Sequence, residues 1–360
     1  MTAPPVAVDV VSTAAEAAAL PVPPLLVLED VERFFDEQGL GSGPPAVRRI
    51  GAGSSNVTFL VERDGARLVL RRPPRPPLPP SAHDMLREAR LQLALAGLGV
   101  RVPRIVAMCD EDALGQPFYV MEHLDGDVVT DVLPPLLEAR EEERRAAVQD
   151  LVDALVEIHA ADVSSPALAA FVRPGSFHER QVRRWSGLWE AAATRDIPDF
   201  TTVGRWLAEN LPEERERTVV HGDFRLGNVM LSRTSPARVL AVLDWEMGAI
   251  GDPRTDVGYL LATYSDGSAA ERTLQLSPVT ARPGFPTRAE LVERYAERSG
   301  RDLRDLPWFE ALALWKSVVF CEAIYQRWLR GEMEGNRFAP GLEQGVPALA
   351  AAAARVAERA

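Results

Sequence analysis

The first third of the chain carries short apolar segments separated by turn-forming residues, which is typical of a β-sheet. Apolar positions at strand spacing predict five strands, at residues 47–51, 57–62, 67–72, 104–109 and 118–121. The prolines from Pro73 to Pro80 end the third strand, and Ser81 then caps a helix that runs to about Leu95. We therefore expect a small antiparallel sheet with one helix beside it.

Most of the remaining chain has the periodicity of amphipathic helices. Residues 1–24 are rich in Ala, Val and Pro and are predicted to be a mobile arm with a short helix at 13–20. We expect an N-terminal lobe at residues 25–122 and a C-terminal lobe at residues 123–360. Helices are predicted at residues 25–38, 141–160, 180–192, 203–210, 288–298 and 306–329, from about 344 onward, and through 264 from a start in the segment 251–256.

Composition narrows the classes of protein. A chain of 360 residues with 46% apolar content buries a sizeable core and normally forms two domains or lobes. The net charge of −12 is not offset by any concentrated basic face, so neither nucleic acid nor an anionic membrane is an expected partner. Cys109 and Cys321 each lie in an apolar stretch, which favours packing roles in a reducing compartment. With no signal-peptide pattern and no membrane-spanning run, we expect a soluble, cytoplasmic protein.

The most informative segment runs from Val219 to Glu246. Asp223 precedes Asn228 by five residues, and Asp244 ends a buried apolar run. In a kinase, such an Asp orients a hydroxyl nucleophile, while the Asn and the second Asp hold a metal. A hairpin alone would explain His-Gly-Asp, because these residues are ordinary turn formers. The combined spacing favours phosphoryl transfer over a simple turn.

Lysine is almost missing from the sequence. Lys316 is the only lysine among 40 cationic side chains, a bias that a GC-rich genome also produces. It lies in a late helical stretch, which we expect to be far from any bound phosphates. The cation that holds the phosphates in a kinase would then have to be an arginine.

This set of motifs resembles the aminoglycoside phosphotransferase family of small-molecule kinases, from about Arg48 to the last helices. Within that family the chain is similar to a branch that includes kinase-like domains fused to acyl-CoA dehydrogenases. The resemblance implies an α+β, bilobal protein-kinase-like fold with a five-stranded antiparallel N-lobe, a larger helical C-lobe and the nucleotide between them. The motifs that carry it are at residues 69–74, 80–83, 117–122, 221–228, 243–246 and 251–253.

The resemblance also assigns roles in binding the nucleotide, which is ATP or GTP. Arg71 on the third strand would hold the phosphates, and Glu88 would pair with Arg71. By itself, Glu88 reads as an exposed helix residue between Arg87 and Arg90. Strand alternation should turn Arg72 to the opposite face. The phosphate loop would include Gly53, Ser54 and Ser55, and the hinge that meets the base would include Met121, Glu122 and His123.

For catalysis, the resemblance makes Asp223 the base and Arg225 the cation that neutralises the transferred phosphoryl group. Asn228 and Asp244 would be the Mg²⁺ ligands. His221 is expected to brace the loop, His159 to pack, and Asp252 and Asp256 to act as caps or anchors. An arginine in place of the usual third-strand lysine keeps the charge but changes its geometry.

The acceptor is expected to be a hydroxyl group of a small molecule, and the branch points to a hydroxyacyl compound. An aminoglycoside or macrolide resistance kinase, a pseudokinase that binds nucleotide without transfer, and a metal-dependent hydrolase stay as alternatives. Specificity should lie in residues 166–210 and 263–288, whose aromatic side chains either line a pocket or fill the core. The oligomeric state is not readable from the sequence.

Overall fold

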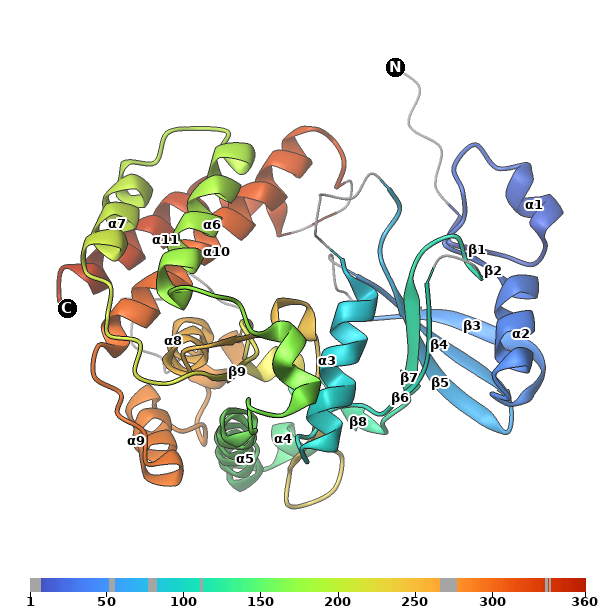
Figure 1. Cartoon of the computed structure of the whole chain (residues 1–360), viewed down its shortest axis with the longest axis horizontal. Helices are drawn as coiled ribbons and strands as arrows, with labels where there is room; N and C mark the ends of the chain where they lie inside the picture. The colour runs from blue at the N-terminus through green and yellow to red at the C-terminus, as the bar shows by residue number, and fades with distance from the viewer. Residues whose placement is uncertain are drawn as a thin grey trace. The chain divides into compact units, whose positions relative to one another are not determined.

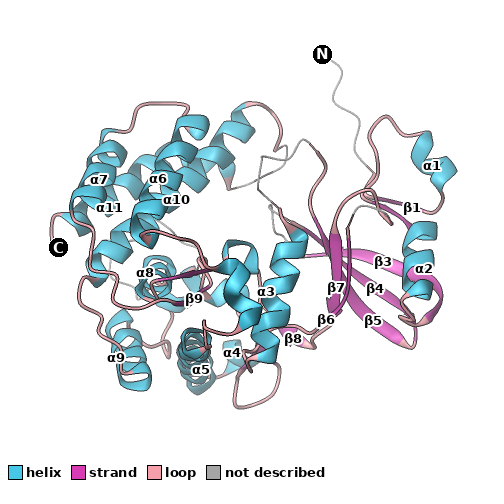
Figure 2. Ribbon diagram, viewed as in Figure 1, coloured by secondary structure: helices cyan, strands magenta, loops and turns pink. Residues whose placement is uncertain are grey.

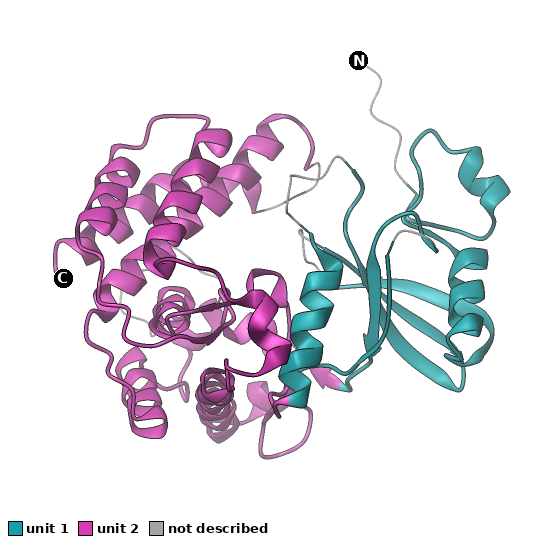
Figure 3. Ribbon diagram, viewed as in Figure 1, with its two compact units in different colours: residues 1–97, 102–125 teal, residues 98–101, 126–360 magenta. Residues whose placement is uncertain are grey.

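The computed structural model describes residues 8–51, 56–76, 83–110, 113–265, 277–333, 336 and 338–360. The chain forms two compact units, which Figure 3 shows in different colours. One comprises residues 1–97 and 102–125, and the other comprises residues 98–101 and 126–360. The main part of the second unit begins at Gly126, whereas the sequence placed a boundary after residue 122. The second unit also contains the short segment 98–101, which interrupts the first unit in sequence.

The first unit is built on a five-stranded sheet in the order β3-β4-β5-β7-β6 (Figure 1). All neighbouring strands pair antiparallel, so the predicted sheet is confirmed. The strands are β3 (Ser42–Ile50), β4 (Val57–Asp64), β5 (Ala66–Arg72), β6 (Ile105–Cys109) and β7 (Phe118–Glu122). On one side, Phe34 and Phe35 of α2 (Leu28–Glu37) are buried in a cluster with Phe59 and Phe118 of the sheet.

Helix α3 (Met85–Gly97) contacts β6 and β7. Met85 and Ala89 of this helix are buried against Tyr119 of β7. The helix begins at Met85, later than predicted, and the expected cap Ser81 lies outside the described residues. This contact fixes Glu88 on the side of α3 that faces the sheet.

The N-terminal segment is more structured than the predicted mobile arm. Residues 8–24 include β1 (Val10–Val11), which pairs parallel with β2 (Leu26–Val27), and α1 (Ala14–Ala18). A capping box between Thr13 and Glu16 begins α1. Arg75 donates hydrogen bonds to the carbonyls of Val8 and Pro23 and forms a salt bridge with Asp9. Local alternation could not reveal these contacts, because a two-residue strand has no periodicity.

The second unit is mainly helical, as Figure 2 shows. The predicted helices α5 and α10 have the expected bounds, the other predicted helices differ by one to five residues at their ends, and α4 was not predicted. The helices are α4 (Pro135–Ala139), α5 (Glu141–Ala160), α6 (Phe177–Ala192), α7 (Pro198–Glu209), α8 (Arg254–Thr263), α9 (Arg288–Ser299), α10 (Leu306–Leu329) and α11 (Leu342–Ala357).

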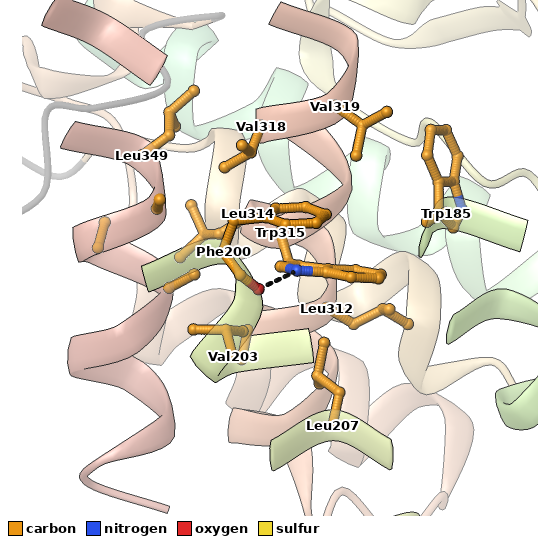
Figure 4. Packing of buried hydrophobic residues seen from close by; sticks show 14 of the residues in the cluster. Trp185, Phe200, Val203, Leu207, Leu312, Leu314, Trp315, Val318, Val319 and Leu349 are labelled. Atoms are coloured by element: carbon orange, nitrogen blue, oxygen red, sulfur yellow. Dashed lines mark hydrogen bonds between the residues drawn. The ribbon is translucent and has the colours of Figure 1, made fainter. Parts of the chain in front are cut away.

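Helix α10 forms the centre of the second unit's core. It packs against α6, α7, α8 and α11, and the indole of Trp315 donates a hydrogen bond of 2.9 Å to the carbonyl of Phe200 (Figure 4). Trp185 and Phe200 are buried in this cluster, while Trp189 and Trp206 pack against it partly exposed. The aromatic residues of the segment 166–210 therefore serve largely as core.

Two small sheets carry the polar segments of the second unit. Strand β9 (Thr218–Val220) pairs with β12 (Ala249–Gly251), and β10 (Val229–Ser232) lies between β11 (Val239–Val242) and β8 (Gly126–Asp127). Both cysteines are free, and burial raises the pKa of the Cys321 thiol to about 12. Among the described helices, none combines the length and apolar character needed to cross a bilayer.

Candidate active site

The loop after β9 is held in place by one buried carboxylate. Asp256, in the first turn of α8, accepts hydrogen bonds from the backbone amides of His221 and Gly222 at 2.6 and 2.7 Å. It also contacts His159, whose other ring nitrogen lies 2.6 Å from the Tyr295 hydroxyl. Burial alone raises the pKa of Asp256, but the hydrogen bonds from His159 and His221 bring that pKa below its ordinary value. Asp256 and His159 are thus structural anchors, as expected.

Gly222 makes the turn before Asp223 sterically feasible. Its φ of +84° lies in the left-handed region, and a Cβ there would come within 2.9 Å of the Met247 carbonyl oxygen. A side chain at this position would displace the loop. The sequence His-Gly-Asp therefore fixes where the Asp223 side chain begins.

Three of the predicted site residues, two catalytic and one a metal ligand, meet on this loop. Asn228 donates hydrogen bonds from Nδ2 to the backbone carbonyl of Asp223 at 2.8 Å and to its carboxylate at 2.6 Å. Arg225 Nε lies 3.5 Å from the other carboxylate oxygen of Asp223. Because Asn228 uses its amide nitrogen in these bonds, its side-chain oxygen is oriented for a different partner.

Asp244 is brought beside Asn228 by the pairing of β10 and β11. Val229 is opposite Val242, and the amide of Leu243 donates a hydrogen bond of 2.8 Å to the carbonyl of Asn228. Asp244 itself has a left-handed backbone, with φ of +67°, a conformation that costs energy in residues other than glycine and often occurs at functional sites. The structure thus hydrogen-bonds the segment that carries the second predicted metal ligand, Asp244, to the first, Asn228.

His221 links the two segments that carry these acids. One ring nitrogen lies 2.8 Å from the carbonyl of Leu243, and the other lies 3.2 Å from the backbone amide of Asp223. A carbonyl requires a donor and an amide requires an acceptor, so His221 is neutral with the proton on Nε2. The Trp245 indole packs on this ring, with centroids 4.7 Å apart. His221 therefore braces the loop and has no nitrogen left for proton transfer.

The donor set of Asn228 and Asp244 fits a magnesium ion that a nucleotide bridges. Mg²⁺ prefers oxygen ligands and is usually held by one or two carboxylates together with substrate phosphates. One amide oxygen and one carboxylate fit this mode of coordination. In the described part of the chain, no group of three or more His, Cys, Asp or Glu side chains is placed to hold a metal ion, so this pair is not part of a complete protein cage.

In the first unit, the structure brings Arg71 and Glu88 together. Arg71 Nε lies 3.3 Å from a Glu88 carboxylate oxygen, which also accepts a hydrogen bond of 3.1 Å from Tyr119. Glu88 is only 1% exposed, so it is a buried partner and not an exposed helix residue. Arg72 is buried and donates to the carbonyl of Leu25, and burial, followed by the charge of Arg75, lowers its pKa to about 10.

The predicted hinge residues Met121, Glu122 and His123 end β7 and continue beyond it. Glu122 pairs with the backbone of Arg104 in both directions, through its amide and its carboxylate. Burial, followed by the charge of Arg67, lowers the pKa of His123. The predicted phosphate-loop residues Gly53, Ser54 and Ser55 lie outside the described residues.

Lys316 lies beside the catalytic loop, a position that the sequence did not predict. Its Nζ lies 3.4 Å from the carbonyl oxygen of Gly222, next to Asp223. Tyr259 of α8 was also missed: burial raises its pKa well above the ordinary value, and the neighbouring Asp223 carboxylate raises it further. The signal for Lys316 was a lone charged residue within the largely apolar stretch 311–321 of α10, whereas Tyr259 gave none.

Known proteins resemble this chain over most of its length. The model of the phosphotransferase enzyme family matches residues 46–309. Acyl-CoA dehydrogenase family member 11 of Gallus gallus is 34% identical over 81% of this chain, and family member 10 of Mus musculus is 34% identical over the same share. The matched regions span only 38% and 27% of those two relatives.

Solved structures show the same fold. A protein of Ralstonia eutropha JMP134, described as an aminoglycoside phosphotransferase, is 28% identical and superimposes with a TM-score of 0.74 over 92% of this chain and 98% of its own. A thermostable mutant of aminoglycoside phosphotransferase APH(4)-Ia, in complex with ADP and hygromycin B, is 17% identical with a TM-score of 0.58. That alignment covers 89% of this chain and 98% of the other.

Proposed function

The chain belongs to the phosphotransferase enzyme family, and on this premise we propose that it transfers the γ-phosphoryl group of ATP or GTP to a hydroxyl group of a small molecule. The observation that carries the proposal is the hydrogen-bonded unit of Asp223, Asn228 and the Leu243–Asp244 segment. A turn with only a structural role has no need for a carboxylate and an amide oxygen beside the adjoining ends of two paired strands.

Asp223 is proposed as the residue that orients the acceptor hydroxyl and accepts its proton. Its side chain is 25% exposed, so a ligand can reach it, and Asn228 fixes the rotation of its carboxylate. General-base residues of this kind contribute about 10² to 10⁴ in rate. The buried scaffold of Asp256 and His221 keeps the carboxylate in one position, which favours a productive acceptor geometry.

Asn228 and Asp244 would hold Mg²⁺, which when bound neutralises charge on the nucleotide phosphates. Arg71 would contact the phosphates, held extended by the buried carboxylate of Glu88. Arg225 would offset negative charge on the transferred group. This division of roles gives each cation a fixed carboxylate neighbour, so the charges are positioned before the ligand binds.

The relatives support a hydroxyacyl compound as the acceptor, because their names place them among the acyl-CoA dehydrogenases. A transfer to an aminoglycoside is the competing possibility, in line with the solved structures of similar fold. Nucleotide consumption measured against a panel of hydroxy acids, hydroxyacyl thioesters, aminoglycosides and macrolides distinguishes these two classes. The Asp223→Asn variant is the control, since nucleotide consumption that depends on the acceptor should disappear with it.

A further inference from the structure

Lys316 is a buried cation with an incomplete set of partners. It is 2% exposed, and its ammonium group lies over the rings of Trp185 and Tyr259, 5.2 and 5.7 Å from their centroids. Within the described residues, its one hydrogen bond is the contact of 3.4 Å with the Gly222 carbonyl, and no salt bridge involves it. An ammonium has three donors, so this group can bind further acceptor atoms.

Burying a charge in this way is unfavourable unless other groups compensate it. The nearest negative charges are Asp256 and Asp223, which favour the charged form of Lys316. The Asp256 oxygens, however, already accept from two backbone amides and His159. Burial remains the larger influence and lowers the pKa of Lys316 to about 8. Asp256 and Asp223 therefore offset only part of the cost of burying the ammonium.

A second cation lies close to the first. Arg184 of α6 places its guanidinium over the Trp185 ring, 5.7 Å from the centroid, so both cations face the same indole. The charge of Arg184 also disfavours the protonated form of Lys316, as expected for two like charges. No carboxylate in the described part of the chain forms a salt bridge with Arg184. Two cations beside one indole, with no salt bridge to either among the described residues, form a basis for binding an anion.

The cation pair is adjacent to the proposed base. Helices α8 and α10 approach so closely that a Cβ on Gly258 would lie 2.6 Å from the backbone of Phe309. This close packing brings Tyr259 under the Lys316 ammonium, and the same Tyr259 lies beside the Asp223 carboxylate. An anion held by Lys316 would therefore be near the hydroxyl group that Asp223 activates.

We propose that Lys316 and Arg184 bind a negatively charged group of the phosphoryl acceptor, either a carboxylate or a phosphate. The acceptor is then a hydroxylated acid or a phosphoester, and not a polycationic aminoglycoside. This inference rests on the proposed function, because only a phosphotransferase has an acceptor. The anion site itself can be tested without nucleotide. The same chemistry could instead bind a phosphate of the nucleotide, so the experiment must separate the two sources.

The single lysine makes the test direct. Protein labelled with an NMR-active isotope at lysine Cε gives one side-chain signal, from Lys316. Malonate and inorganic phosphate are titrated separately at constant ionic strength, with chloride as the control. A saturable shift of the Lys316 signal is expected with at least one of them. Arg184→Gln should weaken that binding about fivefold, whereas Arg183→Gln, on the exposed neighbour in α6, should leave it unchanged.

The other possible results would contradict different parts of the proposal. No saturable shift with either anion, or equal binding by the wild type and Arg184→Gln, would overturn the anion site. A shift with Mg²⁺ and the ATP analogue AMP-PNP but with neither small anion would overturn the assignment to the acceptor. If the anions shift the signal while no magnesium-nucleotide complex binds, the proposed kinase function fails and the anion site stands. Because Arg184 lies on the surface, its variant should fold normally.

Discussion

Asn228 donates its side-chain amide to the Asp223 carboxylate, with Nδ2 2.6 Å from Oδ2. This hydrogen bond determines the orientation of both side chains at once. It fixes the Asp223 carboxylate, and it turns the Asn228 oxygen away from Asp223. The proposed base and the proposed metal ligand are therefore coupled, and a change in one should affect the role of the other.

Substitutions at Asp223 and Asn228 should consequently have different effects on turnover and on nucleotide binding. Asp223→Asn should lower turnover by about 10² to 10⁴, because the base is lost, while nucleotide binding stays nearly unchanged. Asn228→Ala should weaken magnesium-dependent nucleotide binding and turnover together. Steady-state kinetics combined with calorimetric titration of the nucleotide separates the two effects. Equal loss of nucleotide affinity in both variants would contradict these roles.

The two adjacent arginines on β5 should behave differently. Arg71→Ala should weaken nucleotide binding about tenfold or more, because it removes the cation paired with Glu88. Arg72→Ala should instead lower thermal stability, since Arg72 is buried and bonded to Leu25, and should leave nucleotide affinity close to that of the wild type. Thermal melting and nucleotide titration of both variants test this. A larger loss of affinity in Arg72→Ala would show that the wrong arginine has been assigned.

The anchor at Asp256 should matter mainly for folding. Asp256→Asn leaves one of the two buried backbone amides without an acceptor, and we expect a loss of about 2 kcal/mol or more in the free energy of unfolding. Asp196→Asn, an exposed aspartate, is the matched control and should change that free energy by less than about 0.5 kcal/mol. Chemical denaturation measures both. A stable Asp256→Asn variant with normal turnover would contradict the anchoring role.

The buried lysine should give the protein a defined pH dependence. The pKa of Lys316 is lowered from 10.5 to about 8, chiefly by burial, with Arg184 acting in the same direction and Asp256 and Asp223 against it. Between these two pH values the unfolded chain binds more protons, so the stability contributed at this site rises with pH. The free energy of unfolding of the wild type should therefore increase relative to Lys316→Met from about pH 8 to 10.5. A constant difference across that range would show that Lys316 is not shifted.

Much of the fold was predictable because the signals were local. Helices α5 and α10 are long and rich in apolar positions, and the strands of the first sheet are short apolar runs bounded by turn-forming residues. Strands β8, β9 and β12 contain only two or three residues, too few for a period to be visible. The packing of residues 8–24 depends on Arg75 and was not predictable from alternation.

The same distinction holds for the candidate site. Asp223, Arg225 and Asn228 lie within six residues of sequence, so their spacing alone indicated the chemistry. The pairing of Arg71 with Glu88 was implied by family resemblance and not by the local sequence, in which Glu88 reads as exposed. Lys316 reaches Gly222 across 94 residues of sequence, and only the packing of α10 against α8 creates that contact.

Calorimetric titration with Mg²⁺ and AMP-PNP tests the central claim most directly, because it requires no knowledge of the acceptor. The account predicts that the wild type and Asp223→Asn bind the nucleotide only with magnesium, and that Asp244→Ala loses this binding by about a hundredfold or more. If the wild type does not bind the nucleotide, or if Asp244→Ala binds it with unchanged affinity and magnesium dependence, the proposed phosphotransferase site is wrong.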